Sequence, residues 1–275
     1  MSSTPESRQL DLIRERFTES AGSFGDYVLA GRGSEAEKLA ALATAGATDV
    51  SRWHALDVAC GPGTFARALA TRVRFVVGFD LTPALLLRAQ KAVGEASAAA
   101  QSSSAFVCGD GNHMPFRDGA FDLAVCGFSI HHMLHAERVI RELARIVRPG
   151  GRVAIVDMVS RDGYDRELHT RIEQARDASH TKALYVAEFQ ELLQDAGMKI
   201  LTSEVEEKTR NFDVWMNAMK VPRGTPAYAE TRKLLESTME NDAAGMRPRI
   251  NKDGELEYTL PSLYIVAEKQ TPKVK

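Results

Sequence analysis

Short apolar runs alternate with amphipathic helical patterns between about residues 50 and 160. Runs rich in β-branched residues, several of them too continuously apolar to have a wet face, predict strands at His54–Cys60, Phe75–Asp80, Ala105–Asp110, Phe121–Ser129 and Arg152–Val159. Helices are predicted between them at Thr64–Thr71, Pro83–Ala96 and Ala136–Val147. Strands that alternate with helices form βαβ units, so the pattern predicts an α/β fold with a mostly parallel sheet covered on both faces.

The pattern changes after Val159. A charged helical stretch fills residues 160–197, an alternating strand is predicted at Lys199–Lys208, and a last strand at Leu260–Lys269. We therefore expect an N-terminal helical lid at residues 1–50 and a core at 51–275, with a helical insertion around 160–197 and a lobe around 209–257. The final strand is expected to close one edge of the sheet in antiparallel orientation.

Composition narrows the classes of function. The 275 residues carry a net charge of −2, which gives no electrostatic footprint for nucleic acid. No apolar run approaches the roughly 20 residues that span a bilayer, and the polar start is unlike a signal peptide. A cytoplasmic monomer or homodimer with a small-molecule substrate is expected, without a nucleic-acid partner or a membrane span.

The chain has three cysteines, Cys60, Cys108 and Cys126, each near the end of an apolar run. They form no C-x-x-C pair and no Cys/His spacing typical of zinc, so no metal site is predicted. We expect buried, reduced thiols packed between strands and helices. Thiol chemistry, such as binding of a soft metalloid, is the alternative.

The turn after the first predicted strand has the pattern of a nucleotide-binding loop. In "LDVACGPGTFARALA", Gly61, Gly63 and Ala66 fit the G-x-G-x-x-G/A spacing of dinucleotide sites. Glycines let the backbone approach a ligand, and the N-terminus of the following helix favours an anionic group. Taken alone, this loop is typical of a nicotinamide-dependent oxidoreductase.

The next three predicted strands also end in residues able to bind a ligand. Asp80 is placed to accept hydrogen bonds from two ribose hydroxyls, although capping of the following helix explains it equally well. Taken singly, Asp110 with Gly111 favours a plain turn, and His131 and His132 favour ordinary loop residues. All four strand ends share one rim of the sheet, where ligands bind, and this joint pattern favours a binding site.

Four segments in this order resemble the class I S-adenosylmethionine-dependent methyltransferases: "LDVACGPGTFA", "VVGFDLTPALLLRA", "CGDGNHMPFRDGAFDLAVCGFSIHHM" and "ELARIVRPGGRVAIVDMV". Within this family, the four segments are most similar to those of the small-molecule methyltransferases of ubiquinone and menaquinone biosynthesis. The resemblance covers about residues 12–200 and also fits the last strand. It implies a Rossmann-like three-layer sandwich with a seven-stranded, mostly parallel sheet whose last strand is antiparallel, and S-adenosyl-L-methionine as the cofactor.

The resemblance also implies roles for single residues. The implied cofactor-binding residues are Asp57, Ala59, Gly61 and Gly63 for the methionine portion, Asp80 with its neighbour Leu81 for the ribose, Asp110 and Gly111 for the adenine, and Phe128 and Ser129 near the reactive end. Ala59 departs from the pattern, which more often has glycine there. Its methyl group is tolerable if the φ angle is negative.

The segment "IRERFTESAGSFGDYVLA" resembles the helix that covers the cofactor in these enzymes. Phe17, Phe24 or Tyr27 would place a ring face on the sulfonium, a contact worth roughly 0.5–2 kcal/mol. Tyr27 is the favoured cofactor contact. The alternative is that all three form only the apolar stripe that docks this helix on the core.

Two groups of residues are candidates for acceptor chemistry. His131 and His132 lie where a general base is useful, with His132 slightly favoured. The segment "RDASHTKAL" resembles a family stretch near the substrate pocket, which makes Arg176 and His180 candidate substrate residues. Salt-bridged surface positions are the stronger interpretation of these two.

The sequence therefore predicts a methyltransferase that acts on an oxygen, carbon or nitrogen atom of a metabolite or quinone-like ring. A nicotinamide-dependent oxidoreductase is one alternative, although no Tyr-x-x-x-Lys pair follows a later strand. A non-catalytic module that binds S-adenosylmethionine is the other. The chain has no Asn-Pro-Pro-Tyr-type signature after the fourth strand, which argues against methylation of adenine or glutamine.

Overall fold

The computed structural model describes residues 4–96 and 103–271. Its strands form one mixed sheet in the order β3-β2-β1-β4-β5-β8-β6, with β7 paired to β8. The strands are β1 (His54–Val58), β2 (Phe75–Asp80), β3 (Ser104–Cys108), β4 (Phe121–Gly127), β5 (Val147–Met158), β6 (Met198–Asn211), β7 (Arg249–Ile250) and β8 (Leu256–Lys269). Strands β1 to β5 run parallel, and β8 is antiparallel to both β5 and β6. The predicted mostly parallel sheet with an antiparallel last strand is confirmed, and the two-residue β7 adds to it. The expectation that the last strand closes an edge is wrong, because β8 pairs with β5 on one side and with β6 on the other, and β6 is the edge strand there.

The strand β5 begins earlier than its sequence pattern predicts. Val147 pairs with Phe121, and after a register shift Arg152 pairs with Leu123. The turn residues between them fit because Gly151 has no side chain: a Cβ there would lie 2.8 Å from the carbonyl oxygen of Arg148. The helix stop at "RPGG" therefore lies inside the strand instead of before it.

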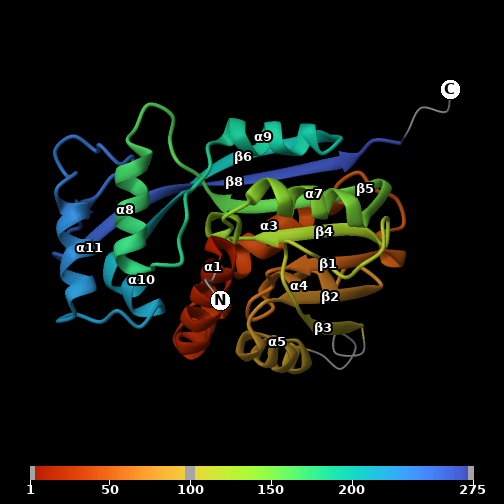
Figure 1. Cartoon of the computed structure of the whole chain (residues 1–275), viewed down its shortest axis with the longest axis horizontal. Helices are drawn as coiled ribbons and strands as arrows, with labels where there is room; N and C mark the ends of the chain where they lie inside the picture. Colours follow the sequence, from red (N-terminus) through yellow and green to blue (C-terminus); the bar gives the residue numbers. More distant parts are fainter. Residues whose placement is uncertain (1–3, 97–102, 272–275) are drawn as a thin grey trace.

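Helices cover both faces of the sheet (Figure 1). They are α1 (Pro5–Glu19), α2 (Ala21–Gly31), α3 (Gly33–Thr44), α4 (Thr64–Ala70), α5 (Pro83–Ala96), α7 (Ala136–Ile146), α8 (Arg166–Arg176), α9 (Val186–Asp195), α10 (Phe212–Ala218) and α11 (Pro226–Glu236). Alternate residues of β4 enter two cores: Leu123 and Val125 pack with α3 and α4, while Ala124 and Cys126 pack with α7 and α9. This two-sided burial explains why the strands read as continuous apolar runs.

A third core joins the long ends of β6 and β8 to α8, α10 and α11. Figure 1 shows β6 and β8 leaving the sheet and running into this group of helices, which we call the lobe. Phe212, Trp215 and Tyr258 fill its centre, with ring centroids 4.8–5.8 Å apart in successive pairs. The lobe therefore extends one end of the sheet. The N-terminal helices connect the two parts: α2 contacts α10 of the lobe and also α3 and α5, which cover the sheet, and α1 contacts α2 and α5.

Two of the three thiols match the prediction, and one does not. Cys60 and Cys126 are buried, but Cys108 is exposed. Cys108 ends β3, which is an edge strand of the sheet, so a strand, β2, flanks it on one side only. Among the residues that the structure describes, no helix combines the length and the apolar character needed to cross a membrane.

Candidate active site

A cavity lies at the carboxyl ends of the parallel strands, where the sheet, α1, α2 and the lobe meet. Its empty volume is about 1350 Å³, a value that includes space open to solvent. The predicted rim of the sheet is therefore the wall of a real cavity.

The loop after β1 is held by one buried carboxylate. Asp80 Oδ2 accepts a hydrogen bond of 2.8 Å from the backbone N–H of Gly61, and Oδ1 accepts one of 2.8 Å from Thr82. Burial raises the pKa of Asp80. Each oxygen keeps a free lone pair, so Asp80 both fixes the loop and can bind a hydroxyl group that enters the cavity.

The two glycines of the loop have different surroundings. Gly61 lines the cavity at φ +53°, and a Cβ there would meet no atom within 4 Å. Gly63 does not line the cavity, and a Cβ there would lie 2.9 Å from Cβ of Ala89 in α5. Gly61 thus leaves open space for a ligand, whereas Gly63 permits close packing of the loop on a helix.

Asp57 lies in β1 and is fully buried, outside the cavity lining. Neither of its carboxylate oxygens has a hydrogen-bond partner among the described residues, and burial raises its pKa well above the usual range. A direct contact between this side chain and a ligand in the cavity therefore finds no support in its position.

Two residues of the cavity wall adopt the left-handed conformation without being glycine. Ala59 has φ +53°, so the condition under which its methyl group is tolerated without strain, a negative φ, is not met. Phe128 has φ +52°, and its N–H donates a hydrogen bond of 2.7 Å to the carbonyl of Val156. Each such residue costs roughly 1–2 kcal/mol, and strain of this kind is concentrated at functional sites.

The ends of β2 and β3 bring Leu81, Asp110 and Gly111 into the same wall. Asp110 Oδ1 accepts hydrogen bonds from the backbone N–H of Asn112 at 2.9 Å and from its side-chain amide at 2.8 Å. These contacts form the turn that its sequence predicted. Oδ2 lies 3.7 Å from a ring nitrogen of the exposed His113, beyond hydrogen-bond distance, and remains able to accept from a ligand.

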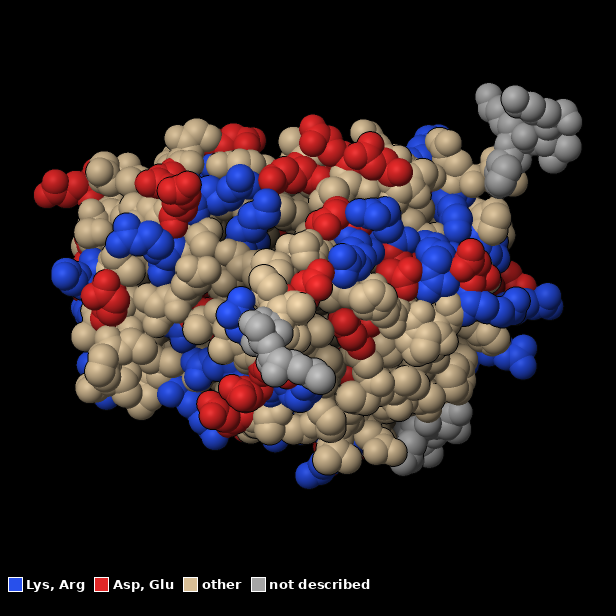
Figure 2. Space-filling model, in the orientation of Figure 1, with Lys and Arg blue, Asp and Glu red and all other residues tan. Residues whose placement is uncertain are grey.

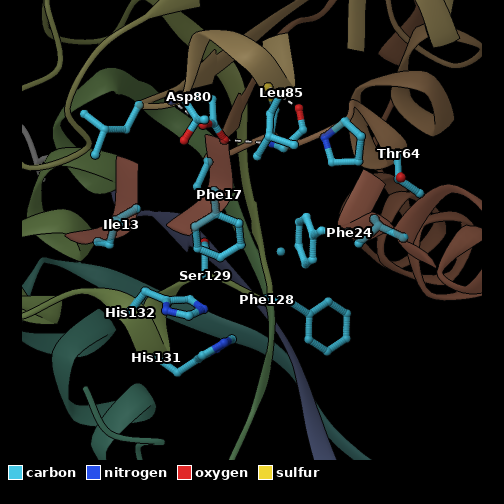
Figure 3. Close-up of a pocket in the computed structure, with 18 of the residues that line it drawn as sticks. Ile13, Phe17, Phe24, Thr64, Asp80, Leu85, Phe128, Ser129, His131 and His132 are labelled. Atoms are coloured by element: carbon cyan, nitrogen blue, oxygen red, sulfur yellow. Dashed lines mark hydrogen bonds between the residues drawn. The ribbon is translucent and has the colours of Figure 1, made fainter. Parts of the chain in front are cut away.

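The N-terminal helices close the cavity from the other side. Phe17, Phe24 and Tyr27 all line it, and the rings of Phe17 and Phe24 meet edge to face at 5.0 Å. Figure 3 shows both phenylalanine rings between Asp80 on one side and the two histidines on the other. The apolar stripe of this segment therefore lies on the cavity and not only on the core.

Arg32 is a cavity residue that the sequence patterns do not indicate. Its guanidinium carbon lies 3.5 Å from the centroid of the Phe128 ring, and burial lowers its pKa. Its Nη1 is buried without a hydrogen-bond partner among the described residues. A buried guanidinium with a free donor at the cavity wall is suited to a carboxylate.

His131 forms a buried pair with a residue from the end of β5. Its Nδ1 lies 2.5 Å from Oδ1 of Asp157, a fully buried carboxyl that also accepts from the backbone N–H groups of Ile130 and Met158, both at 2.7 Å. Burial raises the pKa of Asp157 to about 7 and lowers that of His131 well below its usual range. Asp157 orients the ring. The only indication of this residue in the sequence is that it is an acid within the apolar run "VAIVDMV".

His132 is held by a different chain of contacts. Its Nδ1 lies 3.1 Å from the hydroxyl of Ser179, which donates a hydrogen bond of 2.7 Å to Asp177. Phe17 meets the imidazole edge to face at 5.2 Å. Both histidines line the cavity, and Nε2 of each has no partner among the described residues. Either ring can therefore accept a proton there.

Arg176 and His180 are not surface residues. Arg176 lines the cavity with 11% of its side chain exposed, and its Nε is buried without a partner among the described residues. His180 is 2% exposed and lies behind the wall, with its ring 5.3 Å from that of His131. The surface position is wrong for both residues because α8 and the loop after it pack inside the lobe, although Arg176 does form an ion pair with Glu173.

Comparison with known proteins places this cavity in context. Residues 56–155 match the model of a methyltransferase domain. The chain is similar to methyltransferase GfsG of Streptomyces halstedii, at 34% identity over 166 residues that cover 59% of each protein. It is also similar to a demethylmenaquinone methyltransferase of Lactobacillus johnsonii, at 26% identity over 53% of this chain and 67% of that enzyme.

A solved structure of a candidate methyltransferase from Bacillus halodurans superposes with a TM-score of 0.77 and 25% identity, over 86% of this chain and all of that one. The resemblance seen in the sequence is thus confirmed: residues 56–155, which include the loop at Gly61, match a methyltransferase domain, and the chain is similar in sequence and fold to methyltransferases. The matched part of the chain spans about three fifths of the length of GfsG.

Proposed function

We propose that the protein transfers a methyl group from S-adenosylmethionine to a small-molecule acceptor inside this cavity. The residues after β1, β2 and β3, together with Arg32, form what we call the cofactor side. His131, His132 and the lobe residues Arg176, Arg210, Trp215 and Tyr258 form the acceptor side. The observation that carries the proposal is that one cavity joins these two sides.

The residues of the cofactor side fit the cofactor. Gly61 leaves the space that a Cβ would occupy open, and Asp80 has free lone pairs for the ribose hydroxyls. Arg32 has a free donor for the carboxylate of the methionine portion. Bound S-adenosylmethionine supplies a methyl group on a sulfonium, which is already activated for displacement.

The acceptor side suits a compact apolar molecule. Its walls include Met158, Met219 and Trp215, and α1 covers the opening with Phe17. Enclosure of this kind excludes water and holds the acceptor in line, and such alignment is worth several kcal/mol. A metabolite or a quinone-like ring fits this description, and the similar enzymes that methylate demethylmenaquinone support it.

His131 is the residue that we propose as general base where the acceptor must lose a proton. The Asp157 carboxylate on Nδ1 holds the ring and stabilises the imidazolium that forms, whereas His132 has only a hydroxyl partner there. Because burial lowers the pKa of His131, the ring is neutral at pH 7 and its Nε2 is ready to accept.

The charge on the surface supports a small acceptor. On the face shown in Figure 2, the described acidic and basic side chains are interspersed. A protein that binds nucleic acid concentrates basic residues on one face or stripe. The cavity therefore offers a better acceptor site than this surface.

Two measurements test the proposal. Calorimetric titration with S-adenosylhomocysteine and with NAD should give saturable binding for the first alone. Label from methyl-tritiated S-adenosylmethionine should then pass to members of a panel of phenols, quinols, carboxylic acids and amines. Binding of NAD alone, or labelling confined to added protein or RNA, would contradict the proposal.

A further inference from the structure

Arginines around the cavity differ in whether a carboxylate neutralises them. Arg16 lies 3.7 Å from Asp177, and Arg176 lies 3.4 Å from Glu173. These two cations therefore have partners within the protein. Asp177 and Glu173 are 1% and 0% exposed, so neither carboxylate is available to a further surface cation.

Arg32 and Arg210 also line the cavity, but they have no ion-pair partner among the described residues. Buried or half-buried cations without a counter-charge are costly unless a ligand supplies one. Arg32 lies over Phe128 on the cofactor side, where the methionine carboxylate is expected. Arg210 lies in β6, on the acceptor side; the buried carboxylate of Glu173 acts on it electrostatically as well as on Arg176, but no carboxylate among the described residues forms an ion pair with it.

Arg210 shares its face of the sheet with a buried hydroxyl. Arg210 and Tyr258 are direct partners in the antiparallel pair of β6 and β8, so their side chains project together. Tyr258 lines the cavity, is 0% exposed, and its hydroxyl has no hydrogen-bond partner among the described residues. A buried hydroxyl normally has a partner, which makes this one a donor awaiting a ligand.

Aromatic rings connect this pair to Arg176. Trp215 packs on Tyr258 with ring centroids 4.8 Å apart, and the guanidinium carbon of Arg176 lies 4.4 Å from the centroid of Trp215. Nε of Arg176 is also without a partner. Apart from the ion pair of Arg16 with Asp177, this part of the wall carries the cations Arg176 and Arg210, a free hydroxyl and an indole ring, with the one carboxylate of Glu173 buried behind it. The two cations outnumber the single carboxylate.

We propose that the methyl acceptor carries an anionic oxygen group, such as a carboxylate, which Arg210 and Tyr258 bind with help from Arg176. The apolar body of the acceptor then packs on Trp215, Met158 and Met219. This inference rests on the proposed function, because it specifies the molecule on the acceptor side of the same cavity. Glu173 offsets one of the two positive charges of Arg176 and Arg210, so one positive charge is left for the anion.

Matched pairs of probes test the inference by calorimetry in saturating S-adenosylhomocysteine. The probes are 2-naphthoate against 2-naphthamide, and decanoate against decanamide. We expect at least one carboxylate to bind about tenfold or more tightly than its amide, since an unpaired guanidinium prefers the charged ligand. The preference should disappear in Arg210→Gln and fall about threefold or more in Tyr258→Phe.

The affinity for S-adenosylhomocysteine separates the possible failures. It should stay within about twofold of wild type in Arg210→Gln, which also shows that the variant is folded. Arg249→Gln, at an exposed arginine of the lobe, is the matched control and should retain the preference. Equal binding of both probes of each pair, or no carboxylate binding while S-adenosylhomocysteine binds, would overturn the inference; loss of S-adenosylhomocysteine binding in Arg210→Gln would instead assign Arg210 to the cofactor. Failure of the wild type to bind S-adenosylhomocysteine would overturn the proposed function itself, and the inference with it.

Discussion

The cofactor side and the acceptor side of the cavity are built by different means. Apart from Arg32, the cofactor side uses backbone groups and the carboxylates Asp80 and Asp110, all between Ala59 and Gly111. The acceptor side uses charged side chains from segments far apart in the chain, such as His131, Asp157 and Arg210. The first side is a local structure, and the second depends on the assembly of the lobe on the sheet.

This difference indicates which residues determine cofactor binding and which determine the choice of acceptor. A loop fixed by its own strand and helix can bind one constant ligand with few side chains. A wall of side chains from α8, β6 and β8 can change its acceptor without disturbing that loop. We therefore expect variants on one side to leave the function of the other side intact.

The largest expected effect comes from the acceptor side. His131→Ala should lower kcat by about 10²–10⁴-fold with an acceptor that must lose a proton, because it removes the proposed base. His132→Ala should cost less, and the exposed His54→Ala should cost nothing. The affinity for S-adenosylhomocysteine, measured by calorimetry, should not change in any of them. Full turnover in both His131→Ala and His132→Ala would exclude base catalysis from this loop.

The pH dependence of kcat/KM should reflect the pair of His131 and Asp157. The pKa of Asp157 is raised to about 7, and its ionised form supports His131 as a base. Since the ionised fraction grows as pH rises, kcat/KM should increase through about pH 7 and level off above it. Asp157→Asn should lower kcat/KM and remove this inflection. An unchanged profile in Asp157→Asn would show that another group titrates.

A substitution at Asp80 should impair the cofactor side. Asp80→Ala should weaken binding of S-adenosylhomocysteine by at least about tenfold, or 1.4 kcal/mol, because the Gly61 loop loses its anchor and the ribose loses an acceptor. Calorimetry measures this, with Asp253→Ala in an exposed turn as control. Unchanged affinity would reduce Asp80 to a structural residue at the start of α5.

The same contrast explains how much of the molecule the sequence predicts. The strands and helices around β1 to β5 follow from local periodicity, and their shared rim places Asp80, Asp110 and the histidines together. Arg210 and Tyr258 are 48 residues apart, and they meet only through the register of two long strands. No short motif records such a pairing, so this part of the acceptor side is visible only in the structure.

The φ angle of Ala59 is another feature that the sequence does not predict. Its motif expects glycine, but the sequence alone does not give the sign of φ, and the structure shows +53°. The same is true of Phe128, whose left-handed conformation depends on a hydrogen bond to β5. Backbone strain is a tertiary property, because the surrounding contacts must hold it in place.

The smallest expected effect concerns this strain, at the loop of the cofactor side. Ala59→Gly should raise the free energy of unfolding by about 0.5–1 kcal/mol, because relief of roughly 1–2 kcal/mol at positive φ outweighs the greater freedom of glycine in the unfolded chain. Ala55→Gly, in the strand β1 that leads into this loop and without a positive φ, should lower it by about as much. Urea unfolding of the ligand-free protein measures both changes. If Ala59→Gly is less stable than wild type, the methyl group of Ala59 packs favourably enough to outweigh its strained backbone, and the loop is held by side-chain packing as the acceptor side is.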